Sequence, residues 1–176
     1  EDWMRRHRLR MNPQKQLIWI GSRQQLSKLT VSDIRLSTAV VETDSTVRDL
    51  GVVLDSHLTM IKHVSSVCQS GYYQLRQLRQ IVDSLTIDTA KTLVHSFISC
   101  RIDYCNSLLF GISNEQLQQL QSVQNAAARL VTGTRRFDHI TPVLVGLHWL
   151  PVRYRVSYKL ATVVYKCLHG QAPPYL

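Results

Sequence analysis

The sequence has little glycine and proline and lacks any long apolar run. Seven glycines and five prolines among 176 residues exclude collagen-like and low-complexity chains. There is no stretch of about 18 consecutive apolar residues, so we predict no membrane-spanning helix. Apolar residues make up 44% of the chain and charged residues 19%, which is typical of a folded domain and not of a disordered one.

Cysteine is also scarce, and its spacing matches no known kind of site. The four cysteines include no C-x-x-C pair and no grouping with histidine at zinc-finger spacing. Three of them, Cys68, Cys100 and Cys167, fall near apolar helix faces, and the fourth is Cys105. We therefore expect reduced, buried thiols in an intracellular protein, cytoplasmic or nuclear.

Catalytic motifs are nearly absent. The sequence contains no H-E-x-x-H, no G-x-S-x-G and no Walker motif, and its acidic residues are scattered. Asp44, Asp49 and Asp55 could gather at strand ends and hold a cation, but acids in loops and turns more often face water. We therefore predict no metal site and no cofactor in this chain.

Basic residues outnumber acidic ones, and the excess lies toward the C-terminus. The formal net charge is +9, and residues 113–176 hold seven Lys and Arg against two Asp and Glu. Such a surplus favours a polyanion, through counterion release from phosphates, or anionic lipid. A feature that serves only solubility is the alternative.

The first third of the chain has the pattern of one helix followed by strands. Residues 3–10 predict a basic helix, which the Asn-Pro pair after them ends. The apolar run 17–20 predicts a strand, the alternating β-formers of residues 29–41 predict more extended chain, and residues 47–54 predict a further strand.

From Leu58 the apolar period becomes helical. A long helix is predicted from there to Val82, weakened at Gly71, and a second helix over residues 87–98. A short segment follows at 103–110. We expect three domain parts: a small antiparallel β element in residues 1–57, a helical bundle in 58–170 and a linker in 171–176. The predicted fold class is therefore α+β.

End signals are clearest for the later helices. Ser113 with Gln116 three residues on forms a capping-box pattern, and Gly133 is a plausible C-terminal stop for that helix. Thr141-Pro142 opens another short helix. The last helix follows the break at Pro151, with an apolar stripe expected to face inward that consists of Val156, Leu160, Val163, Val164 and Cys167.

Two basic groups in the C-terminal third are candidate contacts to a nucleic-acid backbone. Arg135 and Arg136 follow Gly133 in a loop, where long side chains can reach a phosphate. Arg155, Lys159 and Lys166 share one face of the last helix, within about 40° at 100° per residue. An ordinary solvated face is the alternative for both groups.

Five segments together resemble one known family. The chain is similar to the downstream part of the reverse transcriptase of a non-LTR retrotransposon, of the CR1/L2-like LINE group, and the resemblance spans almost the whole chain. The segments are WMRRHRLRMNPQKQLIWIGSRQQLSKL (3–29), VRDLGVVLDSHLTMIKHVSSVCQSGYYQLRQLRQI (47–81), LVHSFISCRIDYCNSLLFGI (93–112), LQSVQNAAARLVTGTRR (120–136) and ITPVLVGLHWLPVRYRVSYKLA (140–161), followed by HGQAPPYL (169–176).

The resemblance implies the C-terminal palm and the thumb of such a polymerase. In this family an Asn-Pro-x-Lys stretch contains a lysine thought to help protonate the pyrophosphate leaving group, and Lys15 is the matching residue here. Leu50, Gly51 and Val52 match the primer-grip hairpin, and the helices from Leu58 onward match the thumb. Relatives usually read Asn-Pro-x-Lys-Thr-x-Leu, whereas Gln16-Leu17 follow Lys15 here. This one-residue loss would turn alternate side chains to the opposite face of a strand, which puts the role of Lys15 in doubt.

The family's catalytic aspartates are missing from these residues. The parent polymerase would use Mg²⁺ held by palm aspartates, one pair in a Tyr/Phe-x-Asp-Asp turn, and no such turn occurs in this sequence. We therefore expect a fragment that is inactive alone and contacts the backbone of an RNA–DNA or DNA duplex without sequence preference. A non-enzymatic module retained by a host, binding nucleic acid or protein, and a remnant without function are the alternatives. The sequence predicts no oligomeric state.

Overall fold

The computed structural model describes residues 6–8, 17–31, 33–36 and 39–175. It divides into two compact units, Glu1–Met60 and Ile61–Leu176. The described strands lie in the first unit and most of the helices in the second, so the predicted α+β class is confirmed. Lys15 and most of the helix predicted at residues 3–10 lie outside the described residues.

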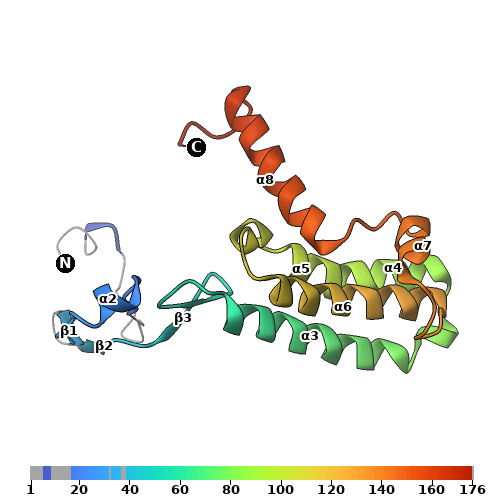
Figure 1. Cartoon of the computed structure of the whole chain (residues 1–176), viewed down its shortest axis with the longest axis horizontal. Helices are drawn as coiled ribbons and strands as arrows, with labels where there is room; N and C mark the ends of the chain where they lie inside the picture. The colour runs from blue at the N-terminus through green and yellow to red at the C-terminus, as the bar shows by residue number, and fades with distance from the viewer. Residues whose placement is uncertain (1–5, 9–16, 32, 37–38, 176) are drawn as a thin grey trace. The chain divides into compact units, whose positions relative to one another are not determined.

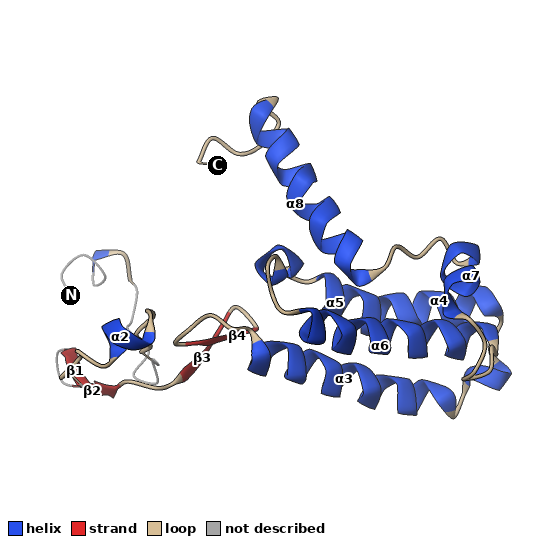
Figure 2. Ribbon diagram, in the orientation of Figure 1, coloured by secondary structure: helices blue, strands red, loops and turns tan. Residues whose placement is uncertain are grey.

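In its described part, the first unit carries a short helix and two separate antiparallel strand pairs (Figure 2). The pairs are β1 Asp33–Leu36 with β2 Ala39–Glu42, and β3 Thr46–Asp49 with β4 Val52–Asp55. The helix α2 (Arg23–Leu26) begins at Ser22, whose hydroxyl accepts from the Gln25 amide while Gln25 Oε1 accepts from the Ser22 amide. This reciprocal capping box satisfies two amides that a helix start otherwise leaves unpaired.

The strand predicted over residues 17–20 is reduced to a single bridge, in which Leu17 pairs with Thr43. The Leu17 carbonyl accepts from the Asp44 amide, whereas the Gly21 amide donates to the Ser56 carbonyl. Because its two ends bond to different parts of the chain, this run does not form a ladder along one neighbouring strand. The β-formers of residues 29–41 are strand only from Asp33 onward.

The single strand predicted over residues 47–54 is a hairpin. Leu50 and Gly51 both have positive φ, 44° and 88°, and they form the two-residue turn between β3 and β4. Two positive φ values are those of a type I′ turn, whose twist matches that of the flanking strands. Residue patterns favour Asn-Gly there, so with leucine at the first position only the family resemblance indicates the hairpin, which the structure has.

Asp55 organises the connection from β4 to the first long helix. Its carboxylate accepts hydrogen bonds from the amides of His57, Thr59 and Met60 and from the Thr59 hydroxyl, at 3.0–3.1 Å. Partial burial is the largest single influence and raises the pKa of Asp55, but these hydrogen bonds together outweigh it, so the net pKa lies below the ordinary value. Leu58 and Met60 have positive φ, so the helix predicted from Leu58 begins later.

The second unit is a helical bundle, with α4 and α5 running back along α3 and α6 (Figure 1). Its elements are α3 Ile61–Arg79, η1 Val82–Ser84, α4 Ile87–Val94, η2 His95–Ser99, α5 Cys100–Asp103, η3 Asn106–Leu109, α6 Asn114–Thr132, α7 Ile140–Gly146 and α8 Val152–Leu168. Its most deeply buried large side chains come from four helices and the η2 turn, and they are Val64, Val94, Ile98, Leu120, Val123 and Val152. The core therefore joins elements far apart in the sequence.

Gly71 allows α3 and α6 to approach closely. A Cβ at this position would lie 2.7 Å from Val123 Cγ1, and both residues are buried. We expected Gly71 only to weaken the long helix, but the missing side chain makes room for a core valine. Helix α3 continues without a break through Gly71, because the packing there outweighs the helix-propensity cost of glycine, about 1 kcal/mol relative to alanine.

Local signals set the ends of α6 as predicted. The Gln116 amide donates to Ser113 Oγ, the Ser113 amide donates to Gln116 Oε1, and Gly133 has a φ of 68° at the C-terminal end. The helix predicted over residues 87–98 instead continues through η2, a π-helical turn, into α5. This continuation leaves Cys100 exposed, so the expectation that it is buried is wrong, whereas Cys68 is buried as expected.

Replacing Gly71 with alanine should destabilise the bundle. The added methyl group meets Val123, and overpacking of this kind costs roughly 1–3 kcal/mol. Gly146 is the matched control, since it is also helical and a Cβ there meets nothing within 4 Å. Gly146→Ala should leave the free energy of unfolding equal or higher. Urea unfolding of both variants measures the difference, and equal effects would contradict the close approach.

The segment after Asp55 should lose order in acid. A carboxylate whose pKa is lowered on folding contributes stability above its unfolded pKa of about 3.9, and the contribution is lost as the pH falls through the lower folded value. The amide chemical shifts of Thr59 and Met60 should therefore titrate together with a midpoint below that of a free aspartate. Asp55→Ala should abolish this titration and cost about 1 kcal/mol, as loss of a capping residue does, whereas Asp49→Ala should do neither. A midpoint above 3.9 would contradict the bonding scheme.

Candidate nucleic-acid interface

Helix α8 carries four cations and no acid. Arg153, Arg155, Lys159 and Lys166 lie within its 17 residues, and neither Asp nor Glu occurs between Val152 and Leu168. At 1.5 Å per residue the helix is about 25 Å long. Figure 1 shows that it leaves the bundle, with only its first turns against the other helices. Most of this basic helix therefore faces solvent.

The apolar stripe predicted to face inward along α8 is buried only at its start. Val152 and Val156 are buried, whereas Leu160, Val163 and Cys167 are half-buried and Val164 is exposed. The prediction is therefore wrong for Val164. The helical period was correct, but a period does not reveal how far along its length a helix stays in contact with its neighbours.

Two glutamines of α6 bond to the chain where α8 begins. The buried Gln124, only 3% exposed, donates from Nε2 to the Leu150 carbonyl at 2.9 Å. Gln121 Oε1 accepts from the Val152 amide at 2.9 Å, which satisfies one of the free amides of the first turn. Gln121 Nε2 donates to Gln124 Oε1 at 2.9 Å and so links the two side chains. We call these two residues the glutamine pair.

An ion pair adds to this anchor. Arg155 Nη1 lies 2.7 Å from Asp103 Oδ2 at the end of α5, and both side chains are partly buried. Arg153 donates to Asn114 Oδ1 at the start of α6. The two arginines of the first turns thus bond to the bundle, whereas Lys159 and Lys166 lie farther along the helix and are exposed.

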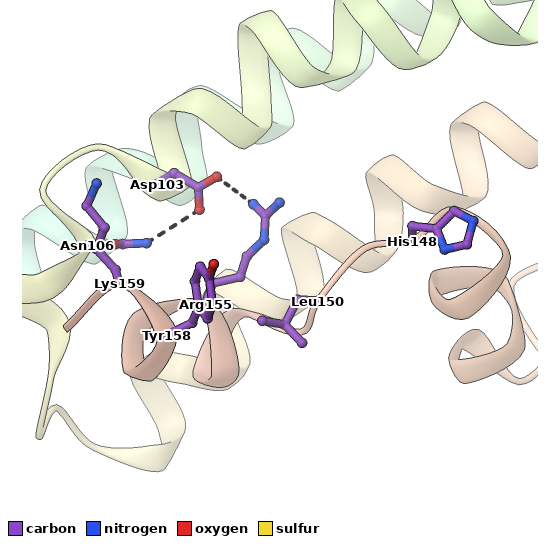
Figure 3. Close-up of a pocket in the computed structure, with 7 residues that line it drawn as sticks. All are labelled: Asp103, Asn106, His148, Leu150, Arg155, Tyr158 and Lys159. Carbon is purple, nitrogen blue, oxygen red and sulfur yellow. Dashed lines mark hydrogen bonds and ion pairs between the residues drawn. The ribbon is translucent and has the colours of Figure 1, made fainter. Parts of the chain in front are cut away.

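A pocket of about 350 Å³ lies beside the Asp103–Arg155 pair (Figure 3). It is lined by Asp103, Asn106, His148, Leu150, Arg155, Tyr158 and Lys159. Asn106 Nδ2 donates to Asp103 Oδ1 at 3.4 Å, so Asp103 bonds to two of its neighbours. Since Asp103 offsets the charge of Arg155, the Lys159 ammonium is the cation left to attract an anion at the pocket edge.

The structure brings together the candidate residues of α8 but not the two basic groups. Arg155 and Lys159 line one pocket, and Lys166 lies seven residues beyond Lys159, about 10 Å along the axis. Arg135 and Arg136 are exposed in the loop after α6, where the Arg135 amide donates to Asp138 Oδ2 at 3.0 Å. In Figure 1 this loop lies at the C-terminal end of α6, whereas η3 precedes the N-terminal end of that helix.

The hairpin candidates form the tip between β3 and β4 in the first unit. Leu50 and Gly51 are exposed and make the turn, and Val52 is buried as the first residue of β4. Leu50 adopts a left-handed conformation that costs a leucine about 1 kcal/mol or more. Strain of this kind at an exposed tip is often found where a backbone has a role beyond stability.

The described residues offer little for catalysis. Among them, no group of three or more His, Cys, Asp and Glu side chains could hold a metal ion. Burial raises the pKa of the Cys68 thiol, which favours its unreactive protonated form. No helix of the described chain has the length and apolar character that crossing a membrane requires. What the geometry does offer is a basic, projecting helix that can attract anions.

Neither the glutamine pair nor the partner of Arg155 is among the residues predicted from the sequence. Gln124 lies four residues after Leu120 and three before Ala127, on the apolar stripe of α6, and a polar residue in such a stripe signals a buried hydrogen bond. That signal could have been found. Nothing local links Arg155 to Asp103, since 52 residues separate them in the chain.

Removing the Gln124 side chain should loosen the base of α8. Gln124→Ala leaves the Leu150 carbonyl without its donor and opens a small cavity, at a cost of roughly 1–3 kcal/mol. Gln119→Ala, an exposed position on the same helix, should change the free energy of unfolding by less than about 0.5 kcal/mol. Thermal unfolding with amide exchange at Val152 to Val156 measures both effects. Unchanged exchange in Gln124→Ala would contradict the anchor.

Comparison with curated proteins finds a relative of this chain. No family model matches the chain, and no solved structure matches it. A curated Drosophila melanogaster protein, described as a probable RNA-directed DNA polymerase from transposon BS, is 28% identical over 133 residues. The match covers 74% of this chain and 15% of that protein, so the chain spans a small part of its relative's length. The similarity supports a relationship to the reverse transcriptases of transposons.

Proposed function

We propose that this chain is the part of a retrotransposon reverse transcriptase that grips the primer and the template–primer duplex. In this proposal the first unit is the end of a palm with a primer-grip hairpin, and the helical unit is a thumb. The parent would be a non-LTR element of the CR1/L2-like LINE group, in keeping with the five segments of resemblance. Its ligand is an RNA–DNA or DNA duplex, bound through the backbone.

The observation that carries the proposal is the charge of α8. Four cations and no acid lie on a helix that leaves the bundle, and the chain is similar to a transposon polymerase. A grip that follows a moving duplex must bind every sequence equally, so it should contact phosphates and not bases. Lysine suits that task, because its ammonium is a flexible point charge without a preferred planar geometry.

The residues divide by task in this proposal. Arg155 and Arg153 hold α8 to the bundle through Asp103 and Asn114, and Lys159 and Lys166 contact phosphates. Arg135 and Arg136 form a second phosphate contact at the other end of α6. The hairpin tip at Leu50, Gly51 and Val52 would lie against the primer, with the exposed Leu50 side chain at the contact.

Polymerase chemistry is assigned to residues outside this sequence. The residues present do not fit a two-metal site, since the 176 residues hold no Asp-Asp pair and the described part has no cluster of metal ligands. Lys15 is kept as a candidate for leaving-group protonation in the intact enzyme. We expect the chain alone to bind a duplex without extending a primer.

A salt titration tests this function. Affinity for blunt RNA–DNA hybrids of two unrelated sequences should be equal and should fall steeply with salt, because phosphate contacts release counterions. Lys159→Ala combined with Lys166→Ala should weaken both hybrids alike and reduce the slope of log K against log salt by about two. Fluorescence anisotropy of labelled hybrids provides the measurement.

Lys91→Ala is the matched control for that experiment. Lys91 lies on α4 and pairs with Asp88 at 3.7 Å, so its removal should leave both affinity and slope unchanged. Binding that is absent at low salt, that ignores salt, or that survives loss of both α8 lysines unchanged would overturn the proposed function.

A further inference from the structure

The outer face of α8 carries an exposed row of tyrosines. Tyr154, Tyr158 and Tyr165 are 59%, 69% and 55% exposed. Starting from Tyr154, steps of four and three residues alternate through Tyr158, Ala161 and Tyr165 to Leu168. These steps average 3.5 residues per turn, so the three tyrosines lie on one side of the helix. The buried Val152 and Val156 lie on the opposite side. We call Tyr154, Tyr158 and Tyr165 the tyrosine row.

The row is flanked by cations on both sides. At 100° per residue, Arg155, Lys159 and Lys166 lie about 100–140° around the helix from Tyr154, and Arg153 lies about 100° the other way. Helix α8 contributes no carboxylate to this surface, and the neighbouring Asp103 of α5 is paired with Arg155. Charge complementarity therefore favours a polyanion. A second copy of α8 would oppose cations with cations, which is unfavourable at close range.

One ring of the row is already held by a stacking contact. The rings of Tyr165 and His169 have centroids 3.9 Å apart and planes 23° apart, and His169 Nδ1 lies 2.8 Å from the Tyr165 carbonyl oxygen. The pair leaves Tyr165 more than half exposed. A ring fixed in this way loses less side-chain entropy when a further flat group stacks beside it.

We propose that the tyrosine row of α8 binds unpaired bases of a single-stranded nucleic acid. Exposed aromatic rings beside a basic surface stack on bases of any sequence, while the cations contact the backbone. The bases of a duplex are paired and stacked on one another, so their faces are not accessible to such a row. This inference rests on the proposed function and adds to it a contact to the unpaired strand next to the gripped duplex.

The length of the row sets the size of the site. Tyr154 and Tyr165 are separated by eleven residues, about 16 Å along the axis. A stacked strand rises about 3.4 Å per nucleotide, so the row spans about five nucleotides. The Tyr158 side chain also lines the pocket that Lys159 and Arg155 line (Figure 3), so the middle ring shares this pocket with two cations.

The experiment compares three labelled ligands of equal length by fluorescence anisotropy. They are an oligothymidylate, an abasic oligonucleotide with the same backbone, and a blunt RNA–DNA hybrid. The chain should bind oligothymidylate more tightly than the abasic strand. Replacing all three tyrosines with leucine should weaken oligothymidylate binding at least about tenfold, as loss of base stacking does, and change the other two ligands less than about twofold.

Two sets of variants control that result. Replacing the same tyrosines with phenylalanine keeps the rings and should retain binding to oligothymidylate. Tyr73→Leu removes an equally exposed tyrosine, 59%, from α3 and should leave all three affinities unchanged. Circular dichroism on every variant verifies that the helices are intact.

The outcomes separate this inference from the proposed function. Equal binding of oligothymidylate and the abasic strand, or no loss in the leucine variant, overturns the inference even when salt-dependent hybrid binding persists. An equal loss for all three ligands also overturns it, since stacking is then not the cause. Self-association that disappears in the leucine variant, measured by sedimentation velocity, would assign the row to a second copy instead. Failure of hybrid binding alone counts against the proposed function and not against the row.

Discussion

The direction of α8 depends on a few polar contacts at its base. Gln124 donates to the Leu150 carbonyl, Gln121 accepts from the Val152 amide, and Arg155 pairs with Asp103. The two fully buried side chains of α8, Val152 and Val156, lie in its first turns, and the directed bonds at the same place set where the helix begins. Because the glutamine pair belongs to the central helix α6, the projecting helix is tied to the core of the bundle.

The core in turn depends on how closely its helices meet. Gly71 lets Val123 of α6 lie against α3, and the glutamine pair flanks Val123 within the same turn of that helix. A shift of α6 away from α3 would therefore also move the two side chains that hold α8. Packed interiors transmit such displacements, since they contain few voids to absorb them. In this way a missing side chain in the core contributes to the placement of a surface that we assign to nucleic acid.

The same geometry gives the arginines and the lysines of α8 different surroundings. Arginine near the base forms a partly buried bond to a carboxylate and an exposed bond to an amide oxygen, for which its planar guanidinium is suited. Lysine occupies the exposed positions farther out, where a mobile charge can follow a backbone without fixing a register. With the tyrosines on the opposite side from the bundle, one face of the helix is used for anchoring and the rest is free for the ligand that we propose.

Elements whose ends are set by neighbouring residues could be predicted from the sequence. Features that depend on contacts between distant parts of the chain could not. Ser113, Gln116 and Gly133 set the ends of α6 within a few residues of chain, and the sequence revealed them. The hairpin turn at Leu50 and the late start of α3 depend on positive φ values at non-glycine residues, for which composition gives no signal, and the hairpin was indicated by the family resemblance alone. At the candidate site, the helical period placed Lys159 and Lys166 on one face. The pairing of Arg155 with Asp103 and the exposure of Val164 depend on tertiary contact and its absence.

The most direct test of the central claim is to map the nucleic-acid surface by amide chemical shifts in the intact chain. A template–primer hybrid with a single-stranded overhang is titrated at low salt into isotopically labelled protein. We expect the largest shift changes along α8, from Arg155 to His169, with little change on α4 around Lys91. Changes confined to other helices, or none at saturating hybrid, would contradict the claim that the projecting basic helix is the gripping surface.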